Sequence, residues 1–285
     1  MAVLLLGGTT ASGKSALAVE LASQHGAAVV SADAMTIYRG LSVGTAKPSM
    51  VDRKGVPHFG IDIRNPDEAF DVAEFADLVG EVVAAFPHTI VVGGTTFWLS
   101  ALVRPLAALP PASPEVRQKL AQLPNPHDAL MRIDPEAAQR LHPNDLVRVV
   151  RALEVHAITG RTQSEIHRDG ARGPALDAAV AWMDRDDIYD RINHRTSVMA
   201  ASGYVEETRE AIRHGYETTK PLKSFAYRHI AEHLAGALSR DEALRRTARD
   251  TRHYAKKQRT WARNLGWEAC SETVIREMWG SLVSR

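Results

Sequence analysis

The eight residues Gly8–Ser15 constrain the fold of this chain more than any other stretch. They read GTTASGKS and fit the phosphate-loop pattern G-x-x-x-x-G-K-[ST]. Residues 2–6 before them form a continuous apolar run, as in a buried parallel strand, and a helical apolar spacing begins at residue 16 and stops near Gly26. Strand, glycine turn and helix in this order predict an α/β fold with a P-loop NTPase-like parallel sheet core flanked by helices.

The predicted turn has the groups that bind a phosphate. We expect the backbone amides of residues 9–14 and the N-terminal end of the helix to hold an anion. Lys14 adds a positive charge, and Ser15 is the predicted Mg²⁺ ligand through its hydroxyl. The pattern does not say whose phosphate is bound, because diphosphates and triphosphates present the same group to the loop.

The ends of the next two predicted strands differ in an informative way. Residues 27–30 look like a second buried strand, and Asp33 follows them at the sheet edge where ligands of open α/β sheets gather. Residues 89–92 form a third run, which ends in Gly93, Gly94, Thr95 and Thr96 instead of the acid that an ATPase usually has there. This weakens the ATPase interpretation but allows a kinase that uses Asp33. For Asp33 alone, the alternative is a turn or helix cap.

Proline and glycine mark a change of organisation in the middle of the chain. Of the 14 prolines, eight lie between Pro105 and Pro143, and the polar segment 158–174 leads into the strand-like residues 178–183. We therefore expect a core made of residues 1–104 and 179–285 and a mainly helical insertion domain at 105–178. Within it, Asn144 and Asp145 can cap a helix on which Arg148 and Arg151 share one face, and one interpretation of these arginines is a solvated face that pairs with Glu154.

The last long helical region is strongly basic. From residue 241 to residue 265 there are eight Lys or Arg against three Asp or Glu, a local net charge of +5 on a chain whose net charge is +1. This predicts an RNA-binding face, with a solvated surface helix as the alternative, and we expect Trp261 to pack in the core. The basic stripe, spaced by four and three, is Arg245, Arg249, Arg252, Lys256, Arg259 and Arg263, and the neighbouring stripe expected to pack on the core is Leu244, Ala248, Thr251, Ala255, Gln258 and Ala262.

Composition narrows the class of protein. Cys270 is the one cysteine, which excludes an internal disulfide framework and a zinc site built from cysteines. No apolar run approaches the roughly 18 residues of a membrane span, and residues 2–6 are too short for a signal peptide. We therefore expect a globular, cytoplasmic protein without membrane contact, and a monomer.

Six segments, taken together, resemble the bacterial tRNA dimethylallyltransferases, also called tRNA isopentenyltransferases. They occur in the family's order up to about Arg263: GTTASGKS, SADAMTIYRGLSVGTAKP, PHFGIDI, GGTTFWLSAL, HPNDLVRVVRALEVHAITGRT and TRHYAKKQRTWAR. The resemblance implies that the loop holds the diphosphate of dimethylallyl diphosphate. It also implies transfer of the dimethylallyl group to N6 of the adenosine just 3′ of the anticodon, with Mg²⁺ as cofactor and the tRNA anticodon stem-loop as partner.

Site residues follow from this resemblance together with the patterns above. Asp33 is the candidate general base, and Thr10 and Lys14 are expected to act on the leaving diphosphate. The predicted diphosphate-binding residues are Gly8, Thr9, Thr10, Ala11, Ser12, Gly13, Lys14 and Ser15. The predicted tRNA-binding residues are Asp33, Ala34, Met35, Thr36, Thr95, Arg117, Val147, Arg148, Val149, Val150, Arg151, Lys223, Ser224, Phe225, Ala226, Tyr227, Arg228, Arg252, Lys256, Lys257, Arg259 and Arg263.

The chain departs from the family pattern at two positions. Thr9 stands where the family usually has Pro, and Ala226 stands where it usually has Gly in an Ile-Gly-Tyr segment. The first change removes a fixed φ, and the second disfavours positive φ and fills space.

Three other functions fit parts of the same pattern. One is a small-molecule or polynucleotide kinase that uses ATP. A free-nucleotide prenyltransferase would need no basic helix, and a non-catalytic, nucleotide-gated RNA-binding module would show no turnover.

Overall fold

The structure is a computed structural model that describes residues 1–104, 106–170 and 175–284. Pro105 of the proline-rich stretch, residues 171–174 of the segment 158–174, and Arg285 lie outside the described residues. Residue contacts divide the chain into two compact units, Met1–Val103 with Asp177–Arg285, and Arg104–Leu176. The limits of the second unit differ from the predicted 105–178 by one or two residues.

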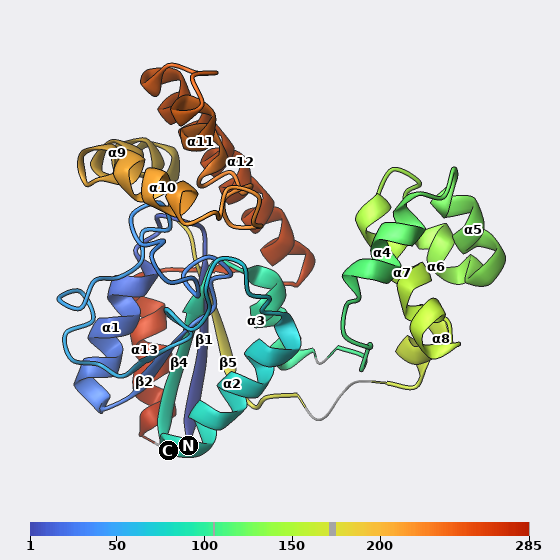
Figure 1. The fold of residues 1–285 in the computed structure, drawn as a ribbon. Helices are drawn as coiled ribbons and strands as arrows, with labels where there is room; N and C mark the ends of the chain where they lie inside the picture. The colour runs from blue at the N-terminus through green and yellow to red at the C-terminus, as the bar shows by residue number, and fades with distance from the viewer. Residues whose placement is uncertain (105, 171–174, 285) are drawn as a thin grey trace. The chain divides into compact units, whose positions relative to one another are not determined.

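A parallel sheet forms the centre of the first unit, which confirms the predicted fold class (Figure 1). Among the described residues it has six strands in the order β3-β2-β4-β1-β5-β6. Several strands that follow one another in the sequence, such as β1 and β2 or β3 and β4, are not neighbours in this sheet, as expected when helical crossovers join parallel strands. The strands are β1 (Ala2–Gly8), β2 (Ala28–Ser31), β3 (His58–Phe59), β4 (His88–Gly93), β5 (Ala179–Met183) and β6 (Ala269–Cys270).

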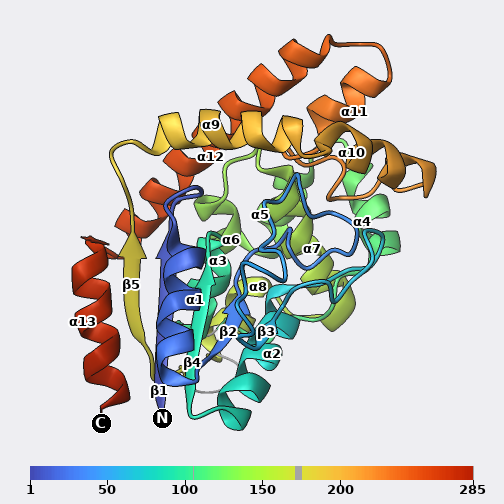
Figure 2. The same cartoon turned by 90° about the vertical axis from the view of Figure 1, so that its left-hand side faces the viewer.

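Helices cover both faces of the sheet. Leu4 and Leu6 of β1 face a core that α1 and α13 close with Leu17 and Trp279, whereas α2 and α3 lie on the opposite face (Figures 1 and 2). The two apolar faces explain why the strands read as continuous apolar runs. These helices are α1 (Lys14–His25), α2 (Val72–Ala85), α3 (Thr96–Val103) and α13 (Glu272–Val283).

Four further helices lie beyond the carboxyl ends of the strands (Figure 2). They are α9 (Ile188–Ala201), α10 (Tyr204–Arg213), α11 (Arg228–Leu234) and α12 (Arg240–Asn264). The predicted basic segment is α12. It starts where the Ser239 hydroxyl accepts a hydrogen bond from the Glu242 amide, and it ends before Gly266, which has a positive φ of 75°. Because α12 crosses this edge of the sheet, its side chains can reach the phosphate loop.

The second unit is helical and has its own small core. Leu130, Ala138, Val149 and Leu153 pack in it. Several of the prolines that marked the boundary in the sequence begin helices, where a missing N–H costs nothing. Its helices are α4 (Pro114–Ala121), α5 (Pro126–Ile133), α6 (Pro135–Arg140), α7 (Leu146–Thr159) and α8 (Gln163–Arg168).

Among the helices that the structure describes, none is both long enough and apolar enough to span a bilayer.

Candidate functional site

The phosphate loop follows β1 in a tight turn that needs two special backbone positions. A side chain at Gly8 would place its Cβ 2.5 Å from the Met183 carbonyl oxygen, so no larger residue fits there. Gly13 has a φ of 98°, which favours glycine, and α1 begins at the next residue. The GTTASGKS pattern thus forms the strand-turn-helix arrangement that the sequence predicts.

The loop amides are only partly available to a ligand. The Thr9 amide donates to the Met183 carbonyl at 3.2 Å, and the Ser12 amide donates to the Thr9 carbonyl at 3.2 Å. The Thr10 amide donates to Oε1 of Gln258 at 2.8 Å. The expectation that all amides of residues 9–14 face the anion is therefore wrong for Thr9, Thr10 and Ser12, because the fold already uses their donors.

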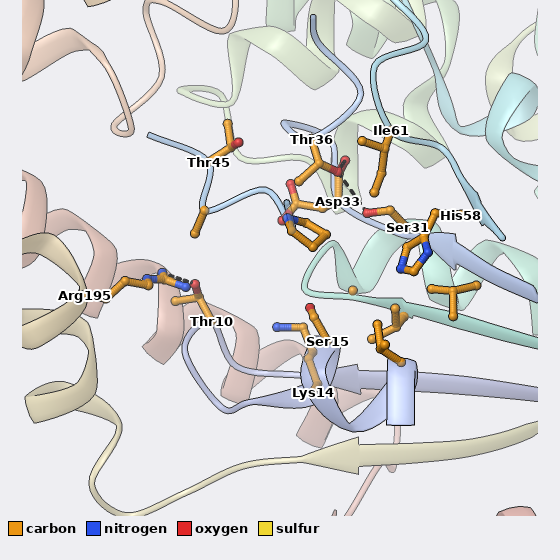
Figure 3. Close-up of a pocket in the computed structure, with 16 residues that line it drawn as sticks. Thr10, Lys14, Ser15, Ser31, Asp33, Thr36, Thr45, His58, Ile61 and Arg195 are labelled. Carbon is orange, nitrogen blue, oxygen red and sulfur yellow. Dashed lines mark hydrogen bonds between the residues drawn. The ribbon is translucent and has the colours of Figure 1, made fainter. Parts of the chain in front are cut away.

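One cavity brings the predicted catalytic residues together. Thr10, Lys14, Ser15 and Asp33 all line it, which agrees with the expectation that Asp33 faces the loop. Figure 3 shows Arg195 at one end of the cavity, beside Thr10. His58 and Ile61 lie at the opposite end in Figure 3, and Val19, Val29 and Val92 also line the cavity. The cavity thus has a cationic end and a more apolar end.

Lys14 is a buried cation at this site. Its side chain is nearly covered, and Nζ donates to the Thr9 carbonyl at 3.1 Å. Burial lowers the pKa of Lys14 from 10.5 to about 8, while the Asp33 carboxylate opposes the change and the Arg195 guanidinium adds to it. A bound anion would stabilise the charged form of Lys14, because its negative charge would replace the interaction with water that burial has removed.

The residues after β2 hold Asp33 in a defined turn. Its Oδ1 accepts a hydrogen bond from the Met35 amide at 2.8 Å. The Ala34 amide donates to the Thr95 hydroxyl at 3.1 Å, and the Thr95 amide donates to the Ala32 carbonyl at 3.1 Å. The turn-capping role is therefore present, and it engages Oδ1 of a carboxylate that also lines the cavity. Thr95 positions this turn.

Steric crowding explains why β4 ends in glycines instead of an acid. A Cβ on Gly93 would lie 2.0 Å from the Ala32 carbonyl oxygen, and one on Gly94 would lie 2.4 Å from Nε2 of Gln258. No side chain, acidic or otherwise, fits at either position without a shift of its neighbours. The acid missing from the sequence is thus excluded by the packing of the loop after β2 and of α12.

Two arginines beside the phosphate loop were missed in the sequence. Arg191 and Arg195 lie one turn apart on α9, where Nε of Arg191 donates to the Ala11 carbonyl at 2.7 Å and the Arg195 guanidinium donates to the Thr10 hydroxyl at 2.5 Å. Burial lowers the pKa of Arg195. The signal that could have found them is their position shortly after β5, at the edge where the other strand ends carry site residues.

The predicted stripes on α12 are largely confirmed. Buried positions on α12 are Ala243, Thr247, Ala248, Thr251, Ala255, Gln258 and Ala262, whereas Leu244 is only partly buried. The basic residues differ from one another. Arg259 pairs with Asp184 at 2.6 Å and Arg252 donates to Asn193 at 2.5 Å, whereas Lys256, Lys257 and Arg263 are exposed, with no ion-pair partner among the described residues.

Trp261 is not a core residue, contrary to the sequence prediction. It is 40% exposed and meets the equally exposed Phe97 edge-on, with ring centroids 6.2 Å apart. The smaller Ala262 takes the buried position next to it.

Several residues that were predicted to contact RNA have buried side chains. The side chains of Val149 and Val150 are buried within the second unit, and those of Ala226 and Tyr227 within the first. Side-chain contact with RNA is excluded for these four in this structure. The Tyr227 hydroxyl instead donates to Glu207 at 2.8 Å. Ala226 adopts no positive φ, so replacing the family's glycine requires no backbone strain.

The remaining predicted contacts of the segment 223–228 differ in exposure. Lys223 and Arg228 are exposed, with Arg228 paired to Asp250 at 2.6 Å, and Ser224 and Phe225 are partly buried.

The predicted arginines of the second unit are engaged within it. Arg117 and Arg151 both bind the buried Glu154, at 3.0 and 2.5 Å, so the Glu154 alternative holds for Arg151. Arg148 pairs with Asp145 at 3.2 Å and is largely exposed, as is Val147. Arg148 is therefore the more available cation on α7.

Comparison with known proteins identifies the family. The sequence model of the family described as IPP transferase matches residues 36–265. A tRNA dimethylallyltransferase from Geobacter metallireducens is 42% identical over 275 residues, which covers 92% of this chain and 89% of the relative. One from Myxococcus xanthus is 40% identical over 272 residues, covering 91% of this chain and 88% of the relative.

Solved structures agree with the sequence match. The tRNA isopentenylpyrophosphate transferase from Bacillus halodurans is 30% identical, with a TM-score of 0.69, and the match covers 99% of this chain and 97% of that one. A eukaryotic dimethylallyltransferase that acts on tRNA is 23% identical over 91% of this chain and 69% of its own, and its TM-score of 0.79 shows a shared fold. This chain therefore belongs to the tRNA dimethylallyltransferase (IPP transferase) family.

Proposed function

We propose that this protein transfers the dimethylallyl group from dimethylallyl diphosphate to N6 of the adenosine 3′-adjacent to the anticodon of tRNAs, and releases diphosphate. The observation that carries the proposal is the cavity in which Lys14, Ser15 and Arg195 lie with Asp33. Family membership supports the same reaction. A cationic group for the leaving diphosphate and a carboxylate for the amine proton are the two elements that this substitution needs.

The cationic end of the cavity suits the leaving group. When the allylic carbon–oxygen bond breaks, its electron pair stays on the diphosphate, and the added charge must be neutralised. Lys14 and Arg195 supply positive charge, and the N-terminal end of α1 adds the amides that the fold has not used. Because a guanidinium only donates, the Thr10 hydroxyl accepts from Arg195 and keeps its own hydrogen for another acceptor. We assign that hydrogen to the bridging oxygen of the substrate.

Asp33 is suited to receive the proton from the nucleophile. The new bond joins N6 of adenine to the allylic carbon, and one amino hydrogen must leave as that bond forms. With Oδ1 engaged by the Met35 amide, the carboxylate is fixed in direction and its second oxygen can accept the proton. Asp33 is therefore the base in this proposal.

The side-chain oxygen atoms near the loop are of the kind that usually coordinate Mg²⁺. No cluster of three or more His, Cys, Asp or Glu that could hold a metal occurs in the part of the chain that the structure describes. Ser15 and Asp33 both line the cavity, and Mg²⁺ is commonly held by one or two protein oxygens together with substrate phosphate oxygens and water. Ser15 would hold the ion through its hydroxyl, and the ion would neutralise part of the diphosphate charge.

The tRNA would bind through basic groups that the fold leaves exposed. Lys256, Lys257 and Arg263 on α12 have no ion-pair partner among the described residues, and in the second unit Arg148 is largely exposed. Backbone phosphates are the natural partners of such side chains. Adenine must also leave its stack to reach the cavity, which costs a few kcal/mol that tight loop contacts would offset.

Mass spectrometry of a reconstituted reaction tests the proposal. The protein is incubated with Mg²⁺, dimethylallyl diphosphate and tRNA that lacks the modification, and the tRNA is digested to nucleosides. We expect one adenosine per tRNA to gain one dimethylallyl group, and expect Asp33→Asn, which keeps the side-chain shape, to form the product about 10²–10⁴-fold more slowly. Absence of product with wild-type protein, together with phosphate transfer from ATP, would replace this proposal with the kinase alternative.

A further inference from the structure

Two neighbouring residues of α12 hold the phosphate loop, Gln258 directly and Arg259 through a carboxylate, although the sequence pattern assigns Arg259 to the basic RNA-facing stripe. Gln258 is 3% exposed. Its Oε1 accepts the Thr10 amide hydrogen at 2.8 Å, and its Nε2 donates to the Gly94 carbonyl at 2.8 Å. One side-chain amide thus joins the turn after β1 to the end of β4.

Arg259 reaches the same turn through a carboxylate. Its Nε donates to Oδ2 of Asp184 at 2.6 Å, and its terminal nitrogen donates to Oδ1 at 3.1 Å and to the Arg185 carbonyl at 2.7 Å. Oδ1 of Asp184 also accepts the Thr9 hydroxyl hydrogen at 2.8 Å. This contact depends on a chain-specific residue, because the family's usual proline at position 9 has no hydroxyl.

We infer that Gln258 and Arg259 are positioning residues of the diphosphate loop and do not belong to the RNA-binding surface. This inference rests on the proposed function. Nε and one terminal nitrogen of Arg259 donate to Asp184 and the Arg185 carbonyl, whereas Lys256, Lys257 and Arg263 are exposed without ion-pair partners among the described residues. The two kinds of basic residue on α12 therefore have different tasks.

Thr9 and Thr10, the two loop residues that these contacts hold, set the geometry of the anion site. The Thr9 carbonyl receives Nζ of Lys14 at 3.1 Å, and the Thr10 hydroxyl receives Arg195 at 2.5 Å. If the backbone at Thr9 and Thr10 moves, both cations lose their orientation. Loss of the α12 contacts should therefore weaken anion binding even when no RNA is present, because a preorganised site has less ordering to do on binding.

Calorimetric titration with inorganic diphosphate, in Mg²⁺ and without RNA, separates the two roles. We expect Arg259→Gln and Asp184→Asn each to raise the dissociation constant about tenfold, the low end for a lost hydrogen bond to a charged group. Arg245→Gln is the matched control, since it makes the same change on the same helix where the arginine pairs with Glu242. We expect it to leave diphosphate affinity unchanged.

A double-mutant cycle supplies a readout that general destabilisation would not move. Thr9→Val keeps the side-chain shape and removes the hydroxyl that binds Asp184. Because Thr9 and Arg259 act through the same carboxylate, the combined Thr9→Val and Arg259→Gln variant should lose less affinity than the sum of the two single changes. Arg259→Lys, which keeps the charge but not the forked geometry, should recover part of the affinity.

Two results would overturn the inference. One is normal diphosphate affinity in Arg259→Gln together with weakened binding of an anticodon stem-loop, which would make Arg259 an RNA contact. The other is strict additivity in the cycle with Thr9. If wild-type protein bound no diphosphate at all, the proposed function itself would be refuted, and this inference with it.

Discussion

Replacement of Lys14 by Met should stabilise the ligand-free protein at pH 7 although it removes a cation of the proposed diphosphate site. Burial holds the pKa of Lys14 near 8 instead of 10.5. At about 1.4 kcal/mol for each pH unit, this difference corresponds to about 3 kcal/mol of unfavourable free energy when the folded protein carries the charged form. The Met variant also loses the hydrogen bond from Lys14 to the Thr9 carbonyl, which reduces its expected gain in stability by about 1 kcal/mol.

The sign of the pH dependence follows from the lowered pKa. Below pH 8 both the folded and the unfolded chain carry the proton, so the burial cost is fully present. As the pH rises from 8 towards 10.5, the folded chain loses its proton first, and the cost disappears. Relative to the Met variant, wild-type protein should therefore gain stability over this range.

Scanning calorimetry of ligand-free protein measures the effect. We expect Lys14→Met to melt about 4–8 °C above wild type at pH 7, which corresponds to about 2 kcal/mol in a chain of this size, and expect the difference to shrink at pH 9.5. Lys257→Met is the matched control, because Lys257 is exposed on α12 and should show no such pH-dependent difference. A lower melting temperature for Lys14→Met at pH 7, or a gap that does not change with pH, would refute the reasoning.

Three further predictions concern the proposed base Asp33, the close packing at Gly94 and the exposed lysines of α12. Asp33→Asn should slow single-turnover transfer by about 10²–10⁴-fold while inorganic diphosphate still binds, and a near-normal rate would remove Asp33 from the role of base. Gly94→Ala places a Cβ 2.4 Å from Nε2 of Gln258, so we expect a loss of about 1–3 kcal/mol in unfolding free energy and weaker diphosphate binding; unchanged melting and affinity would contradict the packing argument. Lys256→Gln combined with Lys257→Gln should weaken RNA binding and reduce the salt slope of log K by about 1.4–1.8, whereas an unchanged slope would make this a merely solvated surface.

Local patterns explain what could be predicted from the sequence. The phosphate loop is a contiguous pattern, and strand, turn and helix follow one another without gaps, so the position of Lys14 and Ser15 at the start of the helix could be predicted directly. Asp33 could be placed because the carboxyl ends of parallel strands share one edge of a sheet. The period of α12 predicted its buried side, since residues at intervals of four and three share a helix face.

The missed features depend on contacts between segments far apart in the chain. Gln258 meets Thr10 across 248 positions, and Arg195 meets it across 185, so no local spacing reveals either contact. The lack of room for a side chain at Gly94 likewise results from contact with α12, which lies far away in the sequence. Exposure of Trp261 was mispredicted because the small Ala262 at the next position takes the buried side of the helix.

The most direct test of the central claim counts products in one rapid-quench experiment. Dimethylallyl diphosphate, Mg²⁺ and unmodified tRNA are mixed with excess protein, and both inorganic diphosphate and dimethylallyl-adenosine are measured over time. If the loop holds a leaving group, diphosphate and modified adenosine appear together in equal amounts, and added ATP is not consumed. Release of monophosphate, or phosphate transfer from ATP without modified adenosine, would contradict the account.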